Sequence, residues 1–200
     1  MQKPYVYDTL DSKRQQIRLL EVLPDQAAKP VQVIIHTAQL PAVYETISYA
    51  WGDPARTAFV TIKTGRLRTQ QCRLWVPVNT EAALRRIRLP GRPRTVWIDF
   101  LCINQNDLTE RSQQVAIMGS IFASSVGNLV YLGELEDAHM AARIQRTIDG
   151  LLTHARSMTD DLQTFDSLSE TQLVGMQRQA LPSTIDYDPV YLVLRLPWFR

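Results

Sequence analysis

Alternating and β-branched stretches dominate the first part of the chain. Apolar positions that recur every second residue, and runs rich in Val and Ile, are typical of β-strands. They predict five strands, at Gln16–Leu23, Val31–Thr37, Tyr44–Tyr49, Phe59–Lys63 and Gln71–Val76. The first two strands are expected to pair antiparallel, and the last two are expected to form a hairpin around Thr64-Gly65.

Helical and strand patterns alternate after residue 78. A helix capped by Asn79-Thr80 precedes Thr95–Leu101, which is nearly all apolar, as a strand buried on both faces should be. A longer helix is expected at Leu108–Ser124, and a second buried strand at Asn128–Leu132. This strand–helix–strand unit favours a parallel sheet with a right-handed crossover.

Together these elements predict one α/β domain over residues 1–200. Its sheet is expected to be mostly parallel and flanked by helices, with an antiparallel β extension on the N-terminal side. The expected parts are a β-rich part at 1–78, a helix–strand core at 79–136 and a helical part at 137–200. The helical part is predicted to hold helices at Asp137–Arg156 and Leu168–Ala180, and a helix or a strand at Tyr187–Leu196.

Composition narrows the class of protein. The 200 residues are 45% hydrophobic and 21% charged, which is ordinary for a soluble globular protein. The net charge of +2 is too small to indicate wholesale binding of nucleic acid or membrane surfaces. No apolar run approaches the ~20 residues of a membrane span, and the first residues lack the apolar core of a signal peptide. We therefore expect a cytoplasmic protein with no nucleic-acid partner.

Charge is unevenly distributed along the chain. Residues 66–94 hold eight arginines and one acid, whereas residues 134–170 hold eight acids and three arginines. These segments either form ordinary solvated surfaces or give the molecule a dipolar surface that helps copies pack head to tail.

The reactive residues form no recognised metal or phosphate signature. Cys72, Cys102, His36, His139 and His154 lack zinc-ligand spacing, and two thiols are too few for a disulfide framework. Neither a GxxxxGK[ST] phosphate loop nor a dinucleotide glycine fingerprint is present. The sequence thus predicts no metal and no cofactor.

Polar side chains gather at the predicted strand Thr95–Leu101. Asp99 is expected near its carboxyl end, where ligand crevices form in open parallel sheets. Its carboxylate either holds a ribose hydroxyl or a cationic nicotinamide ring, or accepts backbone N–H groups of the next loop. In that loop, Asn104 and Gln105 either bind a carboxamide or ribose, or they cap the following helix or close an Asx turn. Cys102 is expected to be a buried thiol rather than a nucleophile.

The helix after this loop opens with charged residues. Asp107 and Glu110 have the spacing of a capping box, which accounts for Glu110 without a further role, and a catalytic role is the alternative. The helix is predicted to bury an apolar stripe of Leu108, Val115, Met118 and Phe122, joined by Ile117 and Ile121, and Arg111 falls on this stripe. Arg111 is therefore expected to pair with Asp99 or Asp107, to face a pocket, or to extend its charged group to solvent.

Another candidate loop follows the strand Tyr44–Tyr49. Gly52 permits positive φ in the turn formed with Asp53. Trp51 either stacks on an adenine or nicotinamide ring, or covers the core. Tyr49 is expected to pack or to hydrogen-bond inward. Tyr49, Trp51, Gly52 and Asp53 are thus candidate ligand-binding residues.

Three strings occur in the order and spacing of a known family. They are YETISYAWGD at 44–53, WIDFLCINQ at 97–105, and VYLG at 130–133. The second string is followed by Asp107, Glu110, Arg111, Gln114, Val115 and Met118. Over about residues 5–135 the chain resembles the heterokaryon-incompatibility (HET) domain of filamentous fungi.

The resemblance implies self/non-self recognition and programmed cell death when genetically different hyphae fuse. It implies self-association, or binding to other HET- or NLR-type incompatibility proteins. HET domains are also distantly similar to Toll/interleukin-1-receptor (TIR) domains, which have a flavodoxin-like parallel sheet. Some TIR domains cleave NAD with one essential glutamate, which suggests NAD as a substrate by analogy between folds.

A departure from the family pattern bears on catalysis. The family's candidate glutamate is expected in a helix after a string like Pro197–Arg200, beyond the last residue of this chain. The sequence therefore leaves open whether the chain is an enzyme. If it is an NAD nucleosidase, Asp99 or Glu110 would replace that glutamate.

Overall fold

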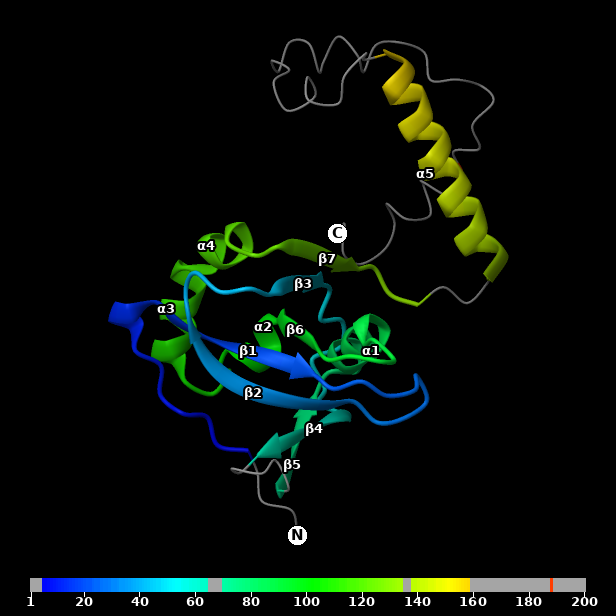
Figure 1. The fold of residues 1–200 in the computed structure, drawn as a ribbon. Helices are drawn as coiled ribbons and strands as arrows, with labels where there is room; N and C mark the ends of the chain where they lie inside the picture. Colours follow the sequence, from blue (N-terminus) through cyan, green and yellow to red (C-terminus); the bar gives the residue numbers. More distant parts are fainter. Residues whose placement is uncertain (1–4, 65–69, 135–137, 159–187, 189–200) are drawn as a thin grey trace. The chain divides into compact units, whose positions relative to one another are not determined.

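The computed structural model describes residues 5–64, 70–134, 138–158 and 188 (Figure 1). The chain divides into two compact units, Met1–Gly133 and Glu134–Arg200. The first unit contains the sheet and the candidate residues named above. The described part of the second unit is essentially the helix α5, Ala138–Met158, close to the predicted Asp137–Arg156. The element predicted at Leu168–Ala180, and all of Tyr187–Leu196 except Asp188, lie outside the described residues.

The first unit is built on one seven-stranded sheet. Its strands are β1 Gln16–Val22, β2 Gln32–Gln39, β3 Glu45–Tyr49, β4 Ala58–Thr64, β5 Gln70–Val76, β6 Arg94–Trp97 and β7 Gly127–Tyr131. Its helices are the 3-10 turn η1 Ser12–Arg14, α1 Val78–Ile87, α2 Asp99–Cys102, α3 Leu108–Ala116 and α4 Met118–Ala123. The five strands predicted before residue 78 are confirmed, with shifts of one or two residues at most ends.

The sheet is mixed, so the prediction of a mostly parallel sheet is wrong. Its strand order is β5-β4-β2-β1-β6-β3-β7. The pairs β2–β4, β3–β6 and β3–β7 are parallel, whereas β1–β2, β1–β6 and β4–β5 are antiparallel. The early strands are therefore no separate extension, because β3 lies between β6 and β7 inside the sheet (Figure 1). Periodicity reports which face of a strand is buried, but it does not report which strand lies next to it.

The strand predicted at Thr95–Leu101 is shorter in the structure. It ends at Trp97, and a helical turn follows in which Cys102 N–H donates to the Ile98 carbonyl at 2.9 Å. All the apolar side chains from Val96 to Ile103 are buried, in the strand and in the turn alike. A short run that is apolar throughout has no period, so the sequence alone does not separate a strand from a buried helical turn.

The helix predicted at Leu108–Ser124 is two helices, α3 and α4, that meet at Ile117. The predicted apolar stripe is wrong for α3, because Leu108 and Val115 are exposed and Glu110 and Gln114 are buried. α3 therefore turns polar side chains inward. A buried carboxylate such as that of Glu110 needs a buried partner, and a strand of the sheet supplies it.

That partner is Arg18, in the middle of β1. Its side chain is 1% exposed and that of Glu110 is 9% exposed. The Arg18 Nη1 and Nη2 atoms donate to the two Glu110 carboxylate oxygens at 2.6 and 2.9 Å, which makes a bidentate pair. Nη1 also donates to the Cys102 carbonyl at 3.1 Å, and the guanidinium lies 4.7 Å from the centre of the Tyr7 ring. The pair ties β1, α3 and the loop between α2 and α3 together.

Breaking this pair is expected to destabilise the first unit strongly. Arg18→Met should lower the free energy of unfolding by about 3–5 kcal/mol, because it leaves the Glu110 carboxylate buried without its cation. Urea denaturation followed by circular dichroism measures the change. Arg14→Met is the control, because Arg14 and its partner Asp11 are 70% and 46% exposed; its cost should stay below about 1 kcal/mol. Equal effects of the two substitutions would contradict the assignment.

Candidate ligand site at the carboxyl ends of β3 and β6

Two parallel strands, β3 and β6, end at the same edge of the sheet. Tyr49 is the last residue of β3, and Trp51 follows it in the next loop. Asp99 comes two residues after the end of β6 and opens α2. Crevices outside the carboxyl ends of strands are common ligand sites in α/β sheets. This edge of the sheet therefore holds three candidate residues from the sequence, Tyr49, Trp51 and Asp99.

The Asp99 carboxylate is half-buried and has direct donors. Oδ2 accepts a hydrogen bond from the Trp51 indole Nε1 at 3.0 Å, and Oδ1 accepts one from the Phe100 amide at 2.6 Å. Burial raises the pKa of Asp99, and hydrogen bonds from Trp51, Phe100 and Tyr49 lower it, leaving a net upward shift. The hydrogen bonds therefore offset only part of the free energy that burial costs the charged Asp99 carboxylate.

Tyr49 connects this carboxylate to helix α1. Its hydroxyl lies 2.8 Å from Thr80 Oγ1, in the first turn of α1. Burial, followed by the charge of Asp99, raises the pKa of Tyr49, so the hydroxyl keeps its proton. The inward hydrogen bonding expected for Tyr49 is confirmed. Thr80 was missed as a site residue, since its sequence position signals only the start of a helix.

An aromatic and cationic surface borders the carboxylate. The Trp51 and Phe100 rings meet edge to face, with centroids 5.4 Å apart and an interplanar angle of 78°. Trp51 is 38% exposed, which leaves part of its ring open to solvent. The guanidinium of Arg56 lies 5.2 Å from the centre of the Phe100 ring. Neither Phe100 nor Arg56 stood out in the sequence as a site residue, because each acquires its place only through the fold.

The loop that carries Trp51 requires glycine at position 52. Gly52 has φ of +67°, and a Cβ there would lie 2.7 Å from the Asn79 amide nitrogen. That nitrogen donates to the Ala50 carbonyl at 2.9 Å, so it has little freedom to retreat. Asp53 is exposed, and its carboxylate accepts the Ala55 amide at 2.9 Å within the same loop. Gly52 and Asp53 thus shape the loop, and Trp51 is the member that reaches the carboxylate.

The other predicted residues make contacts that hold the backbone. The Gln105 amide donates to the Asp99 carbonyl at 3.0 Å, and Asn104 Oδ1 accepts the Asn106 amide at 3.2 Å. Cys102 is fully buried, and burial raises the pKa of its thiol to about 12, so it stays protonated near neutral pH. These three residues fix the loop between α2 and α3 around Asp99.

Glu110 and Arg111 do not join this cluster. Both Glu110 oxygens are occupied by Arg18, and Oε1 also accepts the Asn104 amide at 2.7 Å. The predicted capping is confirmed only for Asp107, whose Oδ1 accepts the amides of Thr109 and Glu110. Arg111 is exposed, which agrees with the alternative that its side chain extends to solvent. Arg18 is almost fully buried instead, and its signal was a charged residue among the apolar side chains of a strand.

The described residues contain no group of three or more His, Cys, Asp or Glu side chains placed to hold a metal ion. Within the same ranges, no helix has the length and apolar character needed to cross a membrane.

Removing the indole donor is expected to raise the pKa of Asp99 further. Trp51→Phe keeps an aromatic ring against Phe100 but loses the hydrogen bond that stabilises the carboxylate. The shift is measured by following the Asp99 carboxyl carbon in an NMR pH titration. Trp75→Phe, a partly exposed tryptophan on β5, is the control and should leave the titration unchanged. A lowered or unaltered Asp99 pKa in Trp51→Phe would refute this account.

Comparisons with known proteins agree with the sequence motifs. The family model described as "Heterokaryon incompatibility protein (HET)" matches residues 44–190. A Neurospora crassa protein, "Heterokaryon incompatibility protein 6, OR allele", is 32% identical over 147 residues, which cover 66% of this chain and 21% of that protein. The match therefore spans about a fifth of the length of this relative. No solved structure matches the chain. The chain belongs to the heterokaryon incompatibility (HET) family.

Proposed function

We propose that this chain acts in fungal heterokaryon incompatibility, as a domain that signals self/non-self difference and triggers cell death. The observation that carries the proposal is the convergence of the family's motif residues. Tyr49 and Trp51 come from the first string and Asp99 from the second, yet they meet at one edge of the sheet. The matched relative is named as a heterokaryon incompatibility protein, which supports the same role.

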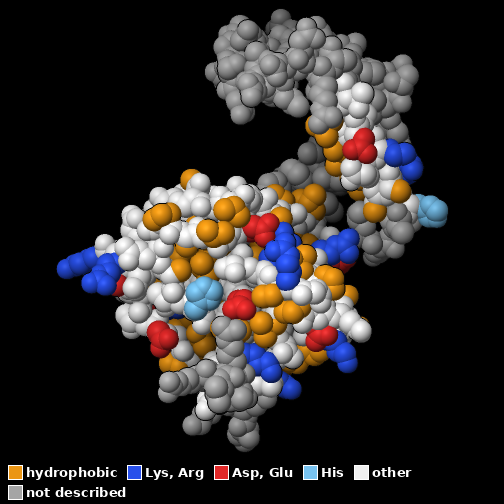
Figure 2. Space-filling model, viewed as in Figure 1, with side chains coloured by type: hydrophobic (Ala, Val, Ile, Leu, Met, Phe, Trp, Pro, Cys, Tyr) orange, Lys and Arg blue, Asp and Glu red, His pale blue; other side chains and the backbone are white. Residues whose placement is uncertain are grey.

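Self-association, or pairing with other incompatibility proteins, is the proposed route to signalling. The uneven charge of the sequence supports it: Arg85 and Arg94 pair within the chain, but exposed arginines such as Arg86 and Arg92 remain to attract the acid-rich residues 134–170 of another copy. Figure 2 shows acidic, basic and hydrophobic side chains interspersed on one face of the first unit. Such a mixed surface is typical of non-obligate protein–protein interfaces.

A growth assay tests the proposed role. The chain is expressed in one of two auxotrophic strains of a compatible filamentous fungus, and the growth of the forced heterokaryon is measured. We expect slower growth and more dye-permeable cells than with an empty vector. Trp51→Ala should weaken this effect because the motif edge loses its indole, whereas Trp75→Ala should retain it. Growth equal to the empty-vector heterokaryon would argue against the proposal.

NAD cleavage at Asp99 is the second candidate function. Two observations favour it: the pKa of the Asp99 carboxyl is raised, and the Trp51 indole lies beside it at the carboxyl ends of β3 and β6. In the proposed reaction, water adds to the ribose carbon of the nicotinamide bond, nicotinamide leaves with the bonding electron pair, and a proton of the water passes to Asp99. The contacts of Glu110 with Arg18 favour Asp99 over Glu110 for this role. The part of the sheet that this proposal compares with a TIR domain is the set of parallel strands β6, β3 and β7.

Asp99→Asn tests the enzymatic candidate. It is expected to reduce nicotinamide release from NAD by at least ~100-fold, because the amide does not accept a proton. Release is followed by chromatography, and Asp11→Asn, a substitution of an exposed acid that caps η1 outside the site, should keep the wild-type rate. Retained release in Asp99→Asn would exclude Asp99 as the base.

Asp99→Asn is also expected to change how the stability of the protein depends on pH. Because the folded-state pKa of Asp99 is raised, its contribution to stability is present at low pH and is lost as pH rises through the folded pKa. Asn does not titrate. The melting temperature of Asp99→Asn relative to wild type is therefore expected to increase between acidic and neutral pH. A melting temperature that falls together with activity would point to a structural role.

A further inference from the structure

A hollow lies at the opposite edge of the same strands from Asp99. It has a volume of about 390 Å³ and is lined by residues next to the amino ends of β3, β6 and β7. Glu45 opens β3 and Arg94 opens β6, whereas Tyr49 and Trp97 end those strands. The hollow is therefore separate from the Asp99 edge, and the inference drawn from it goes beyond the function proposed above.

One wall of the hollow is an ion pair whose groups are already satisfied. Arg94 Nε and Nη2 donate to the two Glu45 carboxylate oxygens at 2.5 and 2.7 Å, and Nη1 donates to the Ile87 carbonyl at 3.0 Å. The hydrogen bond with Arg94 holds the pKa of Glu45 below its usual value. Glu45 and Arg94 thus neutralise one another and fix the shape of the wall.

Arg92 adds a second cation, whose charge helps to lower the pKa of Glu45 without forming an ion pair with it. Two arginines and one glutamate line the hollow, which leaves one net positive charge. Arg92 is exposed, and within the described residues its guanidinium makes no hydrogen bond or ion pair. Thr95 also lines the hollow, and its hydroxyl makes no hydrogen bond in the described part of the chain. These are donors that a ligand would satisfy.

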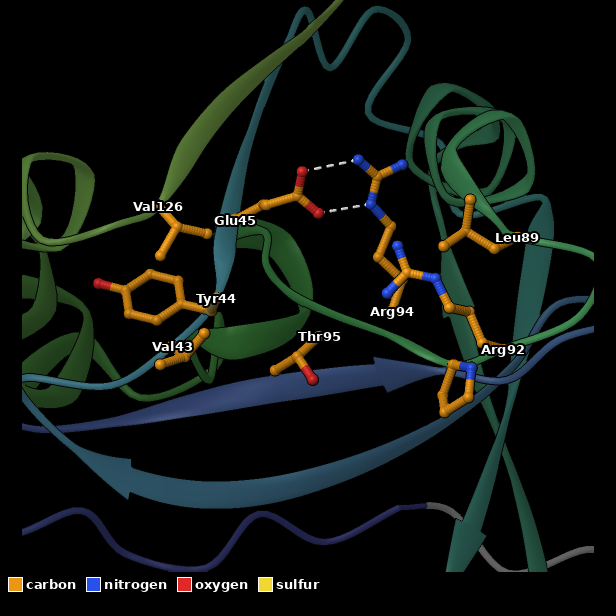
Figure 3. A pocket seen from close by; sticks show the side chains of 9 residues that line it. Val43, Tyr44, Glu45, Leu89, Arg92, Arg94, Thr95 and Val126 are labelled. Atoms are coloured by element: carbon orange, nitrogen blue, oxygen red, sulfur yellow. Dashed lines mark hydrogen bonds and ion pairs between the residues drawn. The ribbon is translucent and has the colours of Figure 1, made fainter.

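The rest of the rim is aliphatic. Val43 and Val126 are 80% and 68% exposed, although both line a concave surface. In Figure 3, Val43 and Val126 lie on one side of the hollow and Leu89 and Arg92 on the other, with the Glu45–Arg94 pair between the two sides. Exposed aliphatic groups facing one another beside a cation match a ligand that is apolar at one end and anionic at the other.

We propose that this hollow binds a small organic acid with one carboxylate and a branched aliphatic body. The carboxylate lies against the Arg92 guanidinium and accepts the Thr95 hydroxyl. The body lies between Val43, Leu89 and Val126. A single net charge and the nearby Glu45 carboxylate disfavour a doubly charged anion such as phosphate. The volume is within the range of about 300–1,000 Å³ that small-molecule sites occupy.

Titration with 4-methylpentanoate tests the proposal. The chain is labelled with ¹³C at its Val and Leu methyl groups, and we expect shifts at Val43, Leu89 and Val126. The neutral 4-methylpentanamide should bind at least ~10-fold more weakly, because a hydrogen bond to a charged group is lost. Arg92→Gln should weaken the acid by a similar factor, and Arg86→Gln, an exposed arginine of α1 outside the hollow, should not. Unchanged melting temperatures confirm that both variants are folded.

Several results would overturn the proposal. They are equal affinity for the acid and the amide, unchanged binding by Arg92→Gln, or methyl shifts that leave Val43 and Val126 unaffected. Absence of shifts at about 10 mM acid would also overturn it, since such weak binding is not specific. If a blocked dipeptide ending in leucine bound more tightly than the free acid, the occupant would be a protein terminus rather than a small molecule.

Discussion

The buried pair of Arg18 and Glu110 is the interaction on which the arrangement of the first unit depends. It places two full charges in the interior, where each needs the other as a partner. Glu110 accepts two bonds from Arg18 and one from the Asn104 amide, and Arg18 also donates to the Cys102 carbonyl. The pair therefore fixes the inward face of α3 and both ends of the loop that follows Asp99. A polar contact, rather than an apolar stripe, orients this helix.

The parallel strands β3 and β6 separate two kinds of chemistry. At their amino ends, Glu45 and Arg94 form a neutral, bonded wall beside an aliphatic rim. At their carboxyl ends, Tyr49 and Asp99 meet under a partly exposed indole. The middle of each strand is buried, so neither set of groups reaches the other through the sheet. Because β3 and β6 run parallel, their amino ends share one edge of the sheet and their carboxyl ends share the other, and the two edges carry different groups.

The two carboxylates Asp99 and Glu110 show how environment separates a structural group from a candidate site. The charge of Glu110 is matched by a bidentate cation. Within the described residues Asp99 makes no ion pair, and its pKa is raised, so its charged form costs the fold free energy. A carboxylate whose charged form is destabilised at the edge of a sheet is a candidate binding site, because a cationic or hydrogen-bonding ligand would stabilise that charge. The geometry therefore favours Asp99 over Glu110, a choice that the motif alone left open.

The sequence by itself determined the class and family of this protein, most of its strands, and the residues Tyr49, Trp51 and Asp99. These signals are local, because alternation, turn residues and motif spacing depend on near neighbours in the chain. Only the tertiary structure decided the mixed strand order, the end of β6 at Trp97 and the inward face of α3. It also supplied Phe100, Arg56 and Thr80 to the site. The physical reason is distance along the chain: the partners Arg18 and Glu110 are 92 residues apart, and no periodic pattern records which distant groups will share a desolvated position.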